Sequence, residues 1–474
     1  MTSRLLRNVS AAALLCATVV AGQAIGSDPA PVVQAQTTGL GSGGEYHALT
    51  PTRIFETRGA GINNPTPGAR PTSPSGSSFN IDVLGQGGVP AEVAGVNRDV
   101  LAVVVNVTVI DPAAAGYLSI SPTDSGAGVS SLVNFGQGEN VPNLAVVGAG
   151  TNGAVAINLV TPTGNATAHV AVDVFGWIAK SDYPDTTDTG ARFIPAGPGR
   201  ILDTRSAPTP AGWPNGRALP ADGRLTLPIR GADSVLPSVT DIVPNAANVT
   251  GVMVNITAVA NTADTFVSAT PNAVPPGQPS TSNTNLRRGR VKANMAIVPV
   301  GADGNIHLYN ASGETHLIVD VLGYLEAGRP ADSTTGRVVP LNAPFRVFDT
   351  RQPEFGSSPL GFGTSESWSF TDFTNSVSLG GVPIGAQSAL LGNLTGTGLT
   401  RTYPTVAVTT YMTMYPGGAS LPESSNINVG EGQTVPNMSL LRYGTEGTDK
   451  NVIKAYNFDG SLHYLLDVYA VVLS

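Results

Sequence analysis

The chain has 474 residues, of which 41% are hydrophobic and 12% are charged, and its formal net charge is −8. This acidic balance argues against nucleic acid or an anionic membrane surface as a partner, because both are bound through clustered cations. The single cysteine, Cys16, excludes a disulfide framework and a cysteine-ligated zinc site within one chain.

The N-terminal segment has the parts of a secretory signal peptide. Two arginines precede an apolar run that ends near Ala21, and small residues follow it. We expect cleavage after Ala24, with Gly26 as the alternative. Residues 1–24 are therefore predicted to be a signal peptide and residues 25–43 a flexible linker. The mature protein is expected to be secreted, either extracellular or associated with the cell wall.

An internal repeat dominates the rest of the sequence. The segment Arg53-Ile-Phe-Glu-Thr-Arg58 returns as Arg200-Ile-Leu-Asp-Thr-Arg205 and as Arg346-Val-Phe-Asp-Thr-Arg351. Each copy continues with an Asn-x-Thr segment, two asparagines nine residues apart and a closing His-x-x-x-Asp segment. Short polar linkers separate the copies. The sequence therefore predicts three domains of one fold, which span residues 44–180, 191–327 and 337–474.

Each repeat is predicted to consist of strands. Residues 101–110 are rich in β-branched side chains, and residues 169–176 show the same pattern, as in strands buried on both sides. We expect about eight short strands per repeat, separated by Gly, Pro or Asn turns, and no long helix. The predicted fold is all-β, with three β-sandwich or jelly-roll-like domains strung in tandem like beads.

This set of motifs resembles a tandem β repeat of secreted actinobacterial surface proteins. The shared pattern is R-x-x-D-T-R, N-x-T, P-N and H-x-x-x-D-V-x-G, and it covers nearly the whole mature chain. The resemblance implies export and a repeated β fold, and it carries no known activity. The third copy departs from the pattern at Ala470, where the others have Gly176 and Gly323.

The repeated polar residues form the candidate site. One interpretation is an anion or sugar-carboxylate site built on the bidentate geometry of arginine. The interpretation that we favour is structural, with an ion pair between the first strand and the closing aspartate that fixes the strand register. On a regular strand, the first arginine and the acid of each motif face opposite ways, whereas the acid and the second arginine share a face. The residues of this network are Arg53, Glu56, Arg58, Asn106, Asn143, Asp173, Arg200, Asp203, Arg205, Asn255, Asn294, Asp320, Arg346, Asp349, Arg351, Asn393, Asn437 and Asp467.

The asparagines of the three Asn-x-Thr segments also match the glycosylation acceptor. Because they lie in the middle of strands, we expect them to face inward and to hydrogen-bond a neighbouring loop backbone. Asn165 and Asn310, beside turns, are expected to be more exposed. The closing His and Asp share a strand face about 13 Å apart, too far to bind one metal ion together. We expect them to be hydrogen-bonded structural positions.

No motif of nucleophilic, phosphate-dependent or metal-dependent catalysis occurs, so we expect no enzyme, no cofactor and no metal. The low charge predicts neutral hydrogen-bonding surfaces, suited to self-association or to contact with cell-envelope polysaccharide. We predict a secreted, non-enzymatic structural protein of the cell surface or extracellular space, without a membrane span after signal removal. The alternatives are a glycan-binding adhesin with repeated sites and an exported hydrolase with an unrecognised site.

Overall fold

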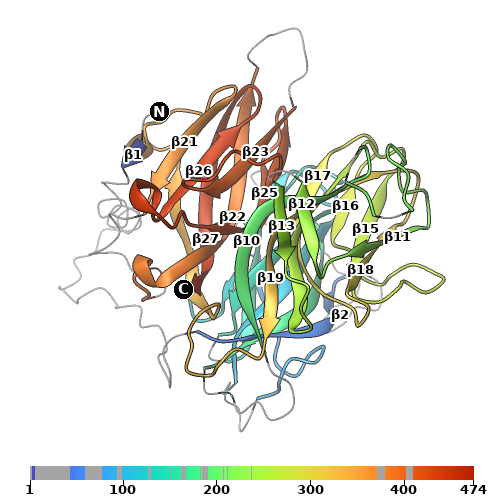
Figure 1. Cartoon of the computed structure of the whole chain (residues 1–474), viewed down its shortest axis with the longest axis horizontal. Coiled ribbons are helices and arrows are strands. Elements are labelled where there is room, and N and C mark those ends of the chain that lie inside the picture. Colours follow the sequence, from blue (N-terminus) through green and yellow to red (C-terminus); the bar gives the residue numbers. More distant parts are fainter. Residues whose placement is uncertain are drawn as a thin grey trace.

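The structure is a computed structural model of the whole chain (Figure 1). It describes residues 3–5, 43–58, 77–92, 99–125, 130–150, 152–161, 167–181, 183, 190–206, 208–210, 212–235, 238–370, 379, 381–401 and 409–474. The predicted signal peptide and linker therefore lie outside the described residues, except for residues 3–5 and 43.

The first repeat is a sandwich of two antiparallel sheets. The inner sheet, which faces the other repeats, has the order β2-β9-β4-β7, with strands β2 (Tyr46–Glu56), β9 (His169–Ala179), β4 (Val100–Ile110) and β7 (Val141–Gly148). The outer sheet has the order β3-β8-β5-β6, with strands β3 (Ser77–Asp82), β8 (Ala154–Val160), β5 (Gly116–Pro122) and β6 (Val133–Phe135).

The second repeat has the same topology. Its inner sheet, β10-β19-β14-β17, is formed by β10 (Ala191–Asp203), β19 (His316–Ala327), β14 (Val249–Val259) and β17 (Lys292–Pro299). Its outer sheet, β11-β18-β15-β16, is formed by β11 (Gly223–Pro228), β18 (Asn305–Asn310), β15 (Thr265–Thr270) and β16 (Thr284–Leu286). An added hairpin consists of β12 (Ala232–Val235) and β13 (Ser238–Val243).

The third repeat follows the same plan. Its inner sheet, β20-β27-β22-β25, is formed by β20 (Val338–Asp349), β27 (Ser461–Leu473), β22 (Gln387–Thr400) and β25 (Val435–Arg442). Its outer sheet contains β21 (Thr364–Ser369), β26 (Val452–Asn457), β23 (Thr409–Pro416) and β24 (Ile427–Gly430). Strand β1 (Ser3–Leu5) runs parallel to the edge of β21.

The predicted all-β class is confirmed. Over the described residues, the first and third repeats have eight strands each, and the helical segments are three short 3₁₀ turns, at Pro353–Phe355, Ile384–Ala386 and Gly447–Asp449. Within the same part of the chain, no helix has the length and apolarity needed to cross a membrane.

The three repeats form one cluster and not a string of separate beads. The edge strands β7, β17 and β25 of the three inner sheets contact one another pairwise, so equivalent strands meet around a common axis. Two of them, β17 and β25, are labelled side by side in Figure 1. One hydrophobic core cluster includes Ile178 from the first repeat, Met295 from the second and Leu440 from the third. The bead-like expectation is corrected here, because the inner sheets bury their second faces against neighbouring repeats.

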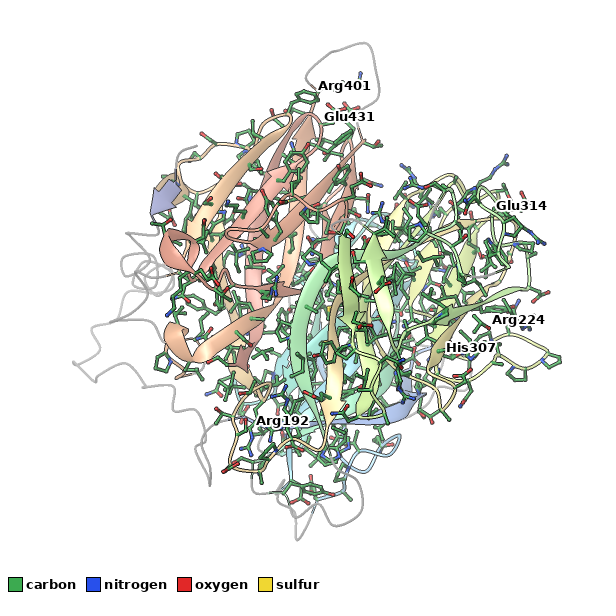
Figure 2. The ribbon with its side chains drawn as sticks, viewed as in Figure 1. Arg192, Arg224, His307, Glu314, Arg401 and Glu431 are labelled. Atoms are coloured by element: carbon green, nitrogen blue, oxygen red, sulfur yellow. The ribbon has the colours of Figure 1, made fainter. Side chains whose placement is uncertain are left out.

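The beginnings of the repeats also meet, and a salt bridge joins them. Gly44 pairs with Val338 in an isolated bridge, and Ala191 pairs with Tyr46, which joins the inner sheets of the first two repeats. Arg192, fully buried, donates from Nε to Glu45 Oε1 at 2.7 Å (labelled in Figure 2). Its Nη1 donates to backbone carbonyls of the segment that leads into the third repeat. Arg192 therefore contacts the starting segments of both other repeats.

Candidate functional site: the repeated polar network and the axial pocket

The first arginine and the acid of each motif lie on the same side of the strand, contrary to the expectation from a regular strand. Arg53 Nη1 and Glu56 Oε2 are 2.7 Å apart, and the equivalent pair Arg346 and Asp349 is 3.3 Å apart. The reason is an irregularity in the strand pairing between Arg53 and Phe55, repeated at the same place in β10 and β20. Such a bulge re-aims the following side chains, so the acid turns back towards the first arginine.

The first arginine also binds the closing aspartate in every repeat. The Nε–Oδ1 distance is 2.8 Å for Arg53 and Asp173, 2.9 Å for Arg200 and Asp320, and 2.8 Å for Arg346 and Asp467. The two residues of each pair are direct neighbours on adjacent strands. The ion pair that the sequence led us to favour is therefore present three times.

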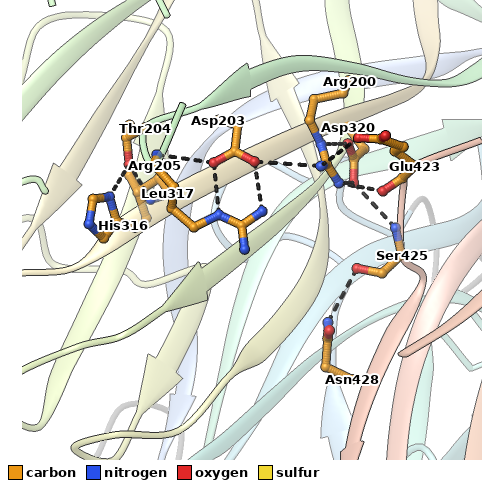
Figure 3. Close-up of polar contacts among 10 residues, drawn as sticks. All are labelled: Arg200, Asp203, Thr204, Arg205, His316, Leu317, Asp320, Glu423, Ser425 and Asn428. Carbon is orange, nitrogen blue, oxygen red and sulfur yellow. Dashed lines mark hydrogen bonds and ion pairs between the residues drawn. The ribbon is translucent and has the colours of Figure 1, made fainter. Parts of the chain in front are cut away.

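The middle copy of this network is linked to the next repeat (Figure 3). Arg200 Nη2 donates to the backbone carbonyl of Glu423 at 2.6 Å, and the Ser425 amide donates to Asp320 Oδ2 at 3.4 Å. Burial raises the pKa of Asp320, and the charge of Arg200 opposes this rise. The pair is thus a buried ionic contact at an interface between repeats.

The second arginine of each motif closes the network at the surface. Arg205 donates from Nε and Nη2 to the two oxygens of Asp203, at 2.9 and 2.7 Å, and the other two repeats have the same bidentate contact. Burial raises the pKa of Asp203, but the hydrogen bonds and charge of Arg205 outweigh it and hold this pKa below the usual 3.8. The pKa values of Glu56 and Asp349 are lowered by the same balance.

The closing histidine is held by the threonine of the motif. Thr204 Oγ1 lies 3.0 Å from His316 Nδ1 and accepts a hydrogen bond from the Leu317 amide at 2.9 Å (Figure 3). The same contacts recur at Thr57 and Thr350. Each His is thus hydrogen-bonded as expected, and no group of three His, Cys, Asp or Glu in the described segments could hold a metal ion.

The mid-strand asparagines are buried, as expected, and bond the loop backbone of a different repeat. Asn106 Nδ2 donates to the Ser282 carbonyl at 2.9 Å, and Asn393 Nδ2 donates to the Ser131 carbonyl at 2.8 Å. Asn255 bonds the Ser425 carbonyl in the same way. Buried at these interfaces, they lack the exposure that a glycan requires.

A second set of asparagines, one in each repeat, joins the mid-strand asparagines in a closed ring. Asn143 Nδ2 donates to Asn393 Oδ1 at 2.9 Å, which joins the first repeat to the third. Asn437 Nδ2 donates to Asn255 Oδ1 at 2.8 Å, which joins the third to the second. Asn294 Nδ2 lies 3.5 Å from Asn106 Oδ1, which joins the second to the first. The cycle of equivalent contacts defines a pseudo-threefold axis.

The arginine pairs and the asparagine ring belong to one row across each inner sheet. Asp173 lies between Arg53 and Asn106 in the strand pairing, and the order Arg–Asp–Asn recurs in the other repeats. At Ser425 the two sets join, since its amide binds Asp320 and its carbonyl binds Asn255. The arginines and carboxylates of the network thus pair with one another within each repeat, and its other hydrogen bonds join one repeat to the next.

A pocket lies at the end of the axis where β7, β17 and β25 begin. Its cavity volume is about 390 Å³, and all three repeats contribute to its wall. The equivalent residues Asn134, Asn285 and Asn428, from β6, β16 and β24, line it together with Lys292. Sequence reasoning treated these asparagines as repeat landmarks and missed the pocket. The signal available was Lys292, one of only four lysines in the chain.

Two expectations about glycosylation sites differ in outcome. Asn310 is fully buried, not exposed, because its Nδ2 donates to the Leu219 and Pro220 carbonyls and to the turn that follows it. The turn that follows Asn310 encloses this side chain, since the Ser312 and Gly313 carbonyls accept hydrogen bonds from its Nδ2. The glycine of that turn predicted a turn but not this burial. Asn165 lies outside the described residues.

No family model matches the sequence, and no curated protein matches it. A chain in the atomic structure of Sulfolobus turreted icosahedral virus is 10% identical over 90% of this chain and 91% of that one, with a TM-score of 0.17. The N-terminal CBM22-1–CBM22-2 tandem domain of Paenibacillus barcinonensis Xyn10C is 11% identical over 49% of this chain and 80% of that one, with a TM-score of 0.16.

Proposed function

We propose that this chain is a secreted, non-enzymatic structural protein of the cell surface or extracellular space, which associates through neutral β faces to coat the envelope or to assemble with itself. The observation that carries the proposal is the asparagine ring, which closes three repeats into one body. Six of the repeated polar residues form this ring, and Arg200 and Asp320 add a further contact between the second and third repeats. Such a network makes the molecule rigid, as a structural building block requires. It also explains why the polar residues are repeated without assigning them a catalytic role.

The outward-facing sheets support this proposal by their chemistry. In β11, exposed and buried residues alternate, and the exposed positions hold Arg224, Thr226 and Pro228. Arg224 and His307 lie on this outer sheet (labelled in Figure 2). In β3, Ser78, Asn80 and Asp82 are exposed. Each of these two strands exposes one charged side chain, Arg224 or Asp82, and its other exposed polar positions offer hydroxyl or amide groups for lateral contact.

The peripheral sheet edges support association as well. β3, β11 and β21 are equivalent strands that flank the outer sheets. β3 and β21 contain neither lysine nor proline, residues that commonly protect an exposed edge from pairing with another chain, whereas β11 has Arg224 and Pro228. In the full chain the edge of β21 pairs with β1, which belongs to the predicted signal peptide, so this edge can pair with another strand once that peptide is removed.

A test compares assembly of the mature chain, residues 25–474, with two triple variants. The edge variant carries Asn80→Lys, Thr226→Lys and Ser365→Lys, and we expect it to sediment as a monomer where the unmodified chain forms larger species. The control adds the same charge at exposed loop positions, Asn272→Lys, Gln278→Lys and Thr448→Lys, and we expect it to associate normally. Strict monomers of the unmodified chain at high concentration would contradict the proposal.

Glycan-binding adhesion is the second candidate function. The axial pocket favours it, because the pocket wall combines amide side chains with apolar surface, as sugar sites require. The tryptophans Trp177, Trp213 and Trp368 occupy different places in their repeats, which argues against a shared aromatic platform.

A further inference from the structure

The single pocket at the end of the pseudo-threefold axis is lined by equivalent strands from all three repeats. Asn134, Asn285 and Asn428 are the second residues of β6, β16 and β24 and place three amides around one cavity of about 390 Å³. Cavities of roughly 300–1,000 Å³ are typical of small-molecule sites. The cavity therefore has the size and the position of a single shared site.

The amides of this wall have unused hydrogen-bonding capacity. Asn134 Oδ1 is buried and has no hydrogen-bond partner among the described residues. Asn285 and Asn428 use Nδ2 to donate to Ser282 Oγ and Ser425 Oγ, at 3.0 and 3.3 Å, which leaves their carbonyl oxygens as acceptors. Buried polar groups are normally satisfied, so an unpaired acceptor beside a cavity points to a ligand or water that donates to it.

One residue breaks the threefold equivalence of the pocket. The position two residues before the ring asparagine is Val141 in the first repeat and Val435 in the third, but Lys292 in the second. Burial lowers the pKa of Lys292 to about 8, and the Glu139 carboxylate partly opposes this shift. A half-buried ammonium in a wall that could have held a third valine is costly unless an anion binds it.

The charges around the pocket favour an anion. Arg287, Arg290 and Lys292 line it, against the single carboxylate of Glu139. Glu139 accepts a hydrogen bond from the Gly136 amide at 3.0 Å, and Arg287 bonds the Gln137 and Gly138 carbonyls across the interface. In a chain with a net charge of −8, this local excess of cations is a distinct feature.

We propose that the axial pocket binds a carboxylated sugar, such as a uronic acid unit of an acidic polysaccharide. The carboxylate of the sugar binds Lys292, Arg287 and Arg290. The sugar hydroxyls donate to the carbonyl oxygens of the three pocket asparagines. The asparagine carbonyl oxygens need hydrogen-bond donors. Sugar hydroxyl groups can donate to them, whereas an inorganic anion without protons can only accept. One sugar unit binds per chain, because only the second repeat supplies the lysine. The site does not depend on assembly of the chain.

Calorimetric titration of the mature chain with digalacturonic acid tests this site. We expect binding that falls about tenfold or more in Lys292→Val, the residue of the other two repeats at this position, and that survives in Lys292→Arg. Lys450→Val, which removes an exposed lysine elsewhere, is the matched control and is expected to bind normally. Thermal unfolding of each variant shows whether it is folded.

Two further ligands and the pH separate the possible sources of binding. We expect the neutral disaccharide maltose to bind much more weakly than digalacturonic acid, and inorganic phosphate not to displace the acidic sugar at equal concentration. Affinity should decline above pH about 8 as Lys292 loses its proton; the other charged side chains that line the pocket are Arg287, Arg290 and Glu139. Equal binding of maltose, full displacement by phosphate, or unchanged affinity in Lys292→Val would each overturn the proposal. Because the edge-lysine variant leaves the pocket intact, loss of assembly in it with normal sugar binding separates the two proposals.

Discussion

Asn143 of the first repeat donates a hydrogen bond to Asn393 of the third repeat at 2.9 Å, although 250 residues separate them in sequence. The same Asn143 accepts a hydrogen bond from the Met438 amide at 3.0 Å and donates to the Leu132 carbonyl at 2.7 Å. One fully buried side chain thus connects its own loop with two strands of another repeat.

Replacement of this residue should therefore destabilise the whole chain. Asn143→Ala leaves the Met438 amide and Asn393 Oδ1 buried without the partner they have in Asn143, which we expect to cost about 1–3 kcal/mol of unfolding free energy. Chemical denaturation measures it. Asn272→Ala, at an exposed position, is the control and should change stability by less than about 0.5 kcal/mol. If both variants unfold alike, Asn143 does not hold the repeats together.

The buried ion pair of the second repeat should contribute more than its exposed neighbour. Arg200→Met leaves Asp320 charged and buried without its main partner, and we expect a loss of about 3–5 kcal/mol. Arg205→Met removes a half-exposed guanidinium and should cost less than about 1 kcal/mol. Denaturation of the two variants side by side checks the order, and a larger loss at Arg205 would contradict it.

The threonine of each motif should be replaceable by serine but not by valine. Thr204→Val removes the acceptor for the Leu317 amide and the partner of His316 Nδ1, at an expected cost of about 1–2 kcal/mol. Thr204→Ser keeps the hydroxyl and should restore most of that stability. Thermal unfolding distinguishes the two, and equal melting temperatures would show that the hydroxyl is not needed.

Acid should weaken the fold through the carboxylates bound by the second arginines. The pKa values of Glu56, Asp203 and Asp349 are lower in the folded chain than their usual 4.5 or 3.8, because the arginines favour the ionised forms. Their contribution to stability is complete above those usual values and is lost as the pH falls through the lowered ones. Asp203→Asn should therefore reduce the loss of stability between pH 7 and pH 3, whereas Asp332→Asn, at an exposed position, should not. Identical acid limbs in Asp203→Asn and the unmodified chain would contradict this assignment.

Local pattern was enough to predict the strands and the internal ion pairs. Valines at every second position identify β4. The arginine and the aspartate that pair as Arg53 and Asp173 in the first repeat recur in every copy, which indicates a contact that the fold requires. The bulge after Arg53 could not be predicted, because it depends on pairing with β9. The contacts between repeats could not be predicted either, since the Asn-x-Thr motif does not reveal which loop its asparagine will meet. The axial pocket exists only after three copies are joined, so no single repeat reveals it.

The most direct test of the central claim is microscopy and fractionation of cells that produce the full chain. If the chain is a structural building block, the processed protein should sediment with the envelope, and purified residues 25–474 should form ordered layers or filaments in electron micrographs. The edge-lysine variant should remain in the medium as single particles. Processed protein found only in the medium, as single particles at every concentration, would contradict the account.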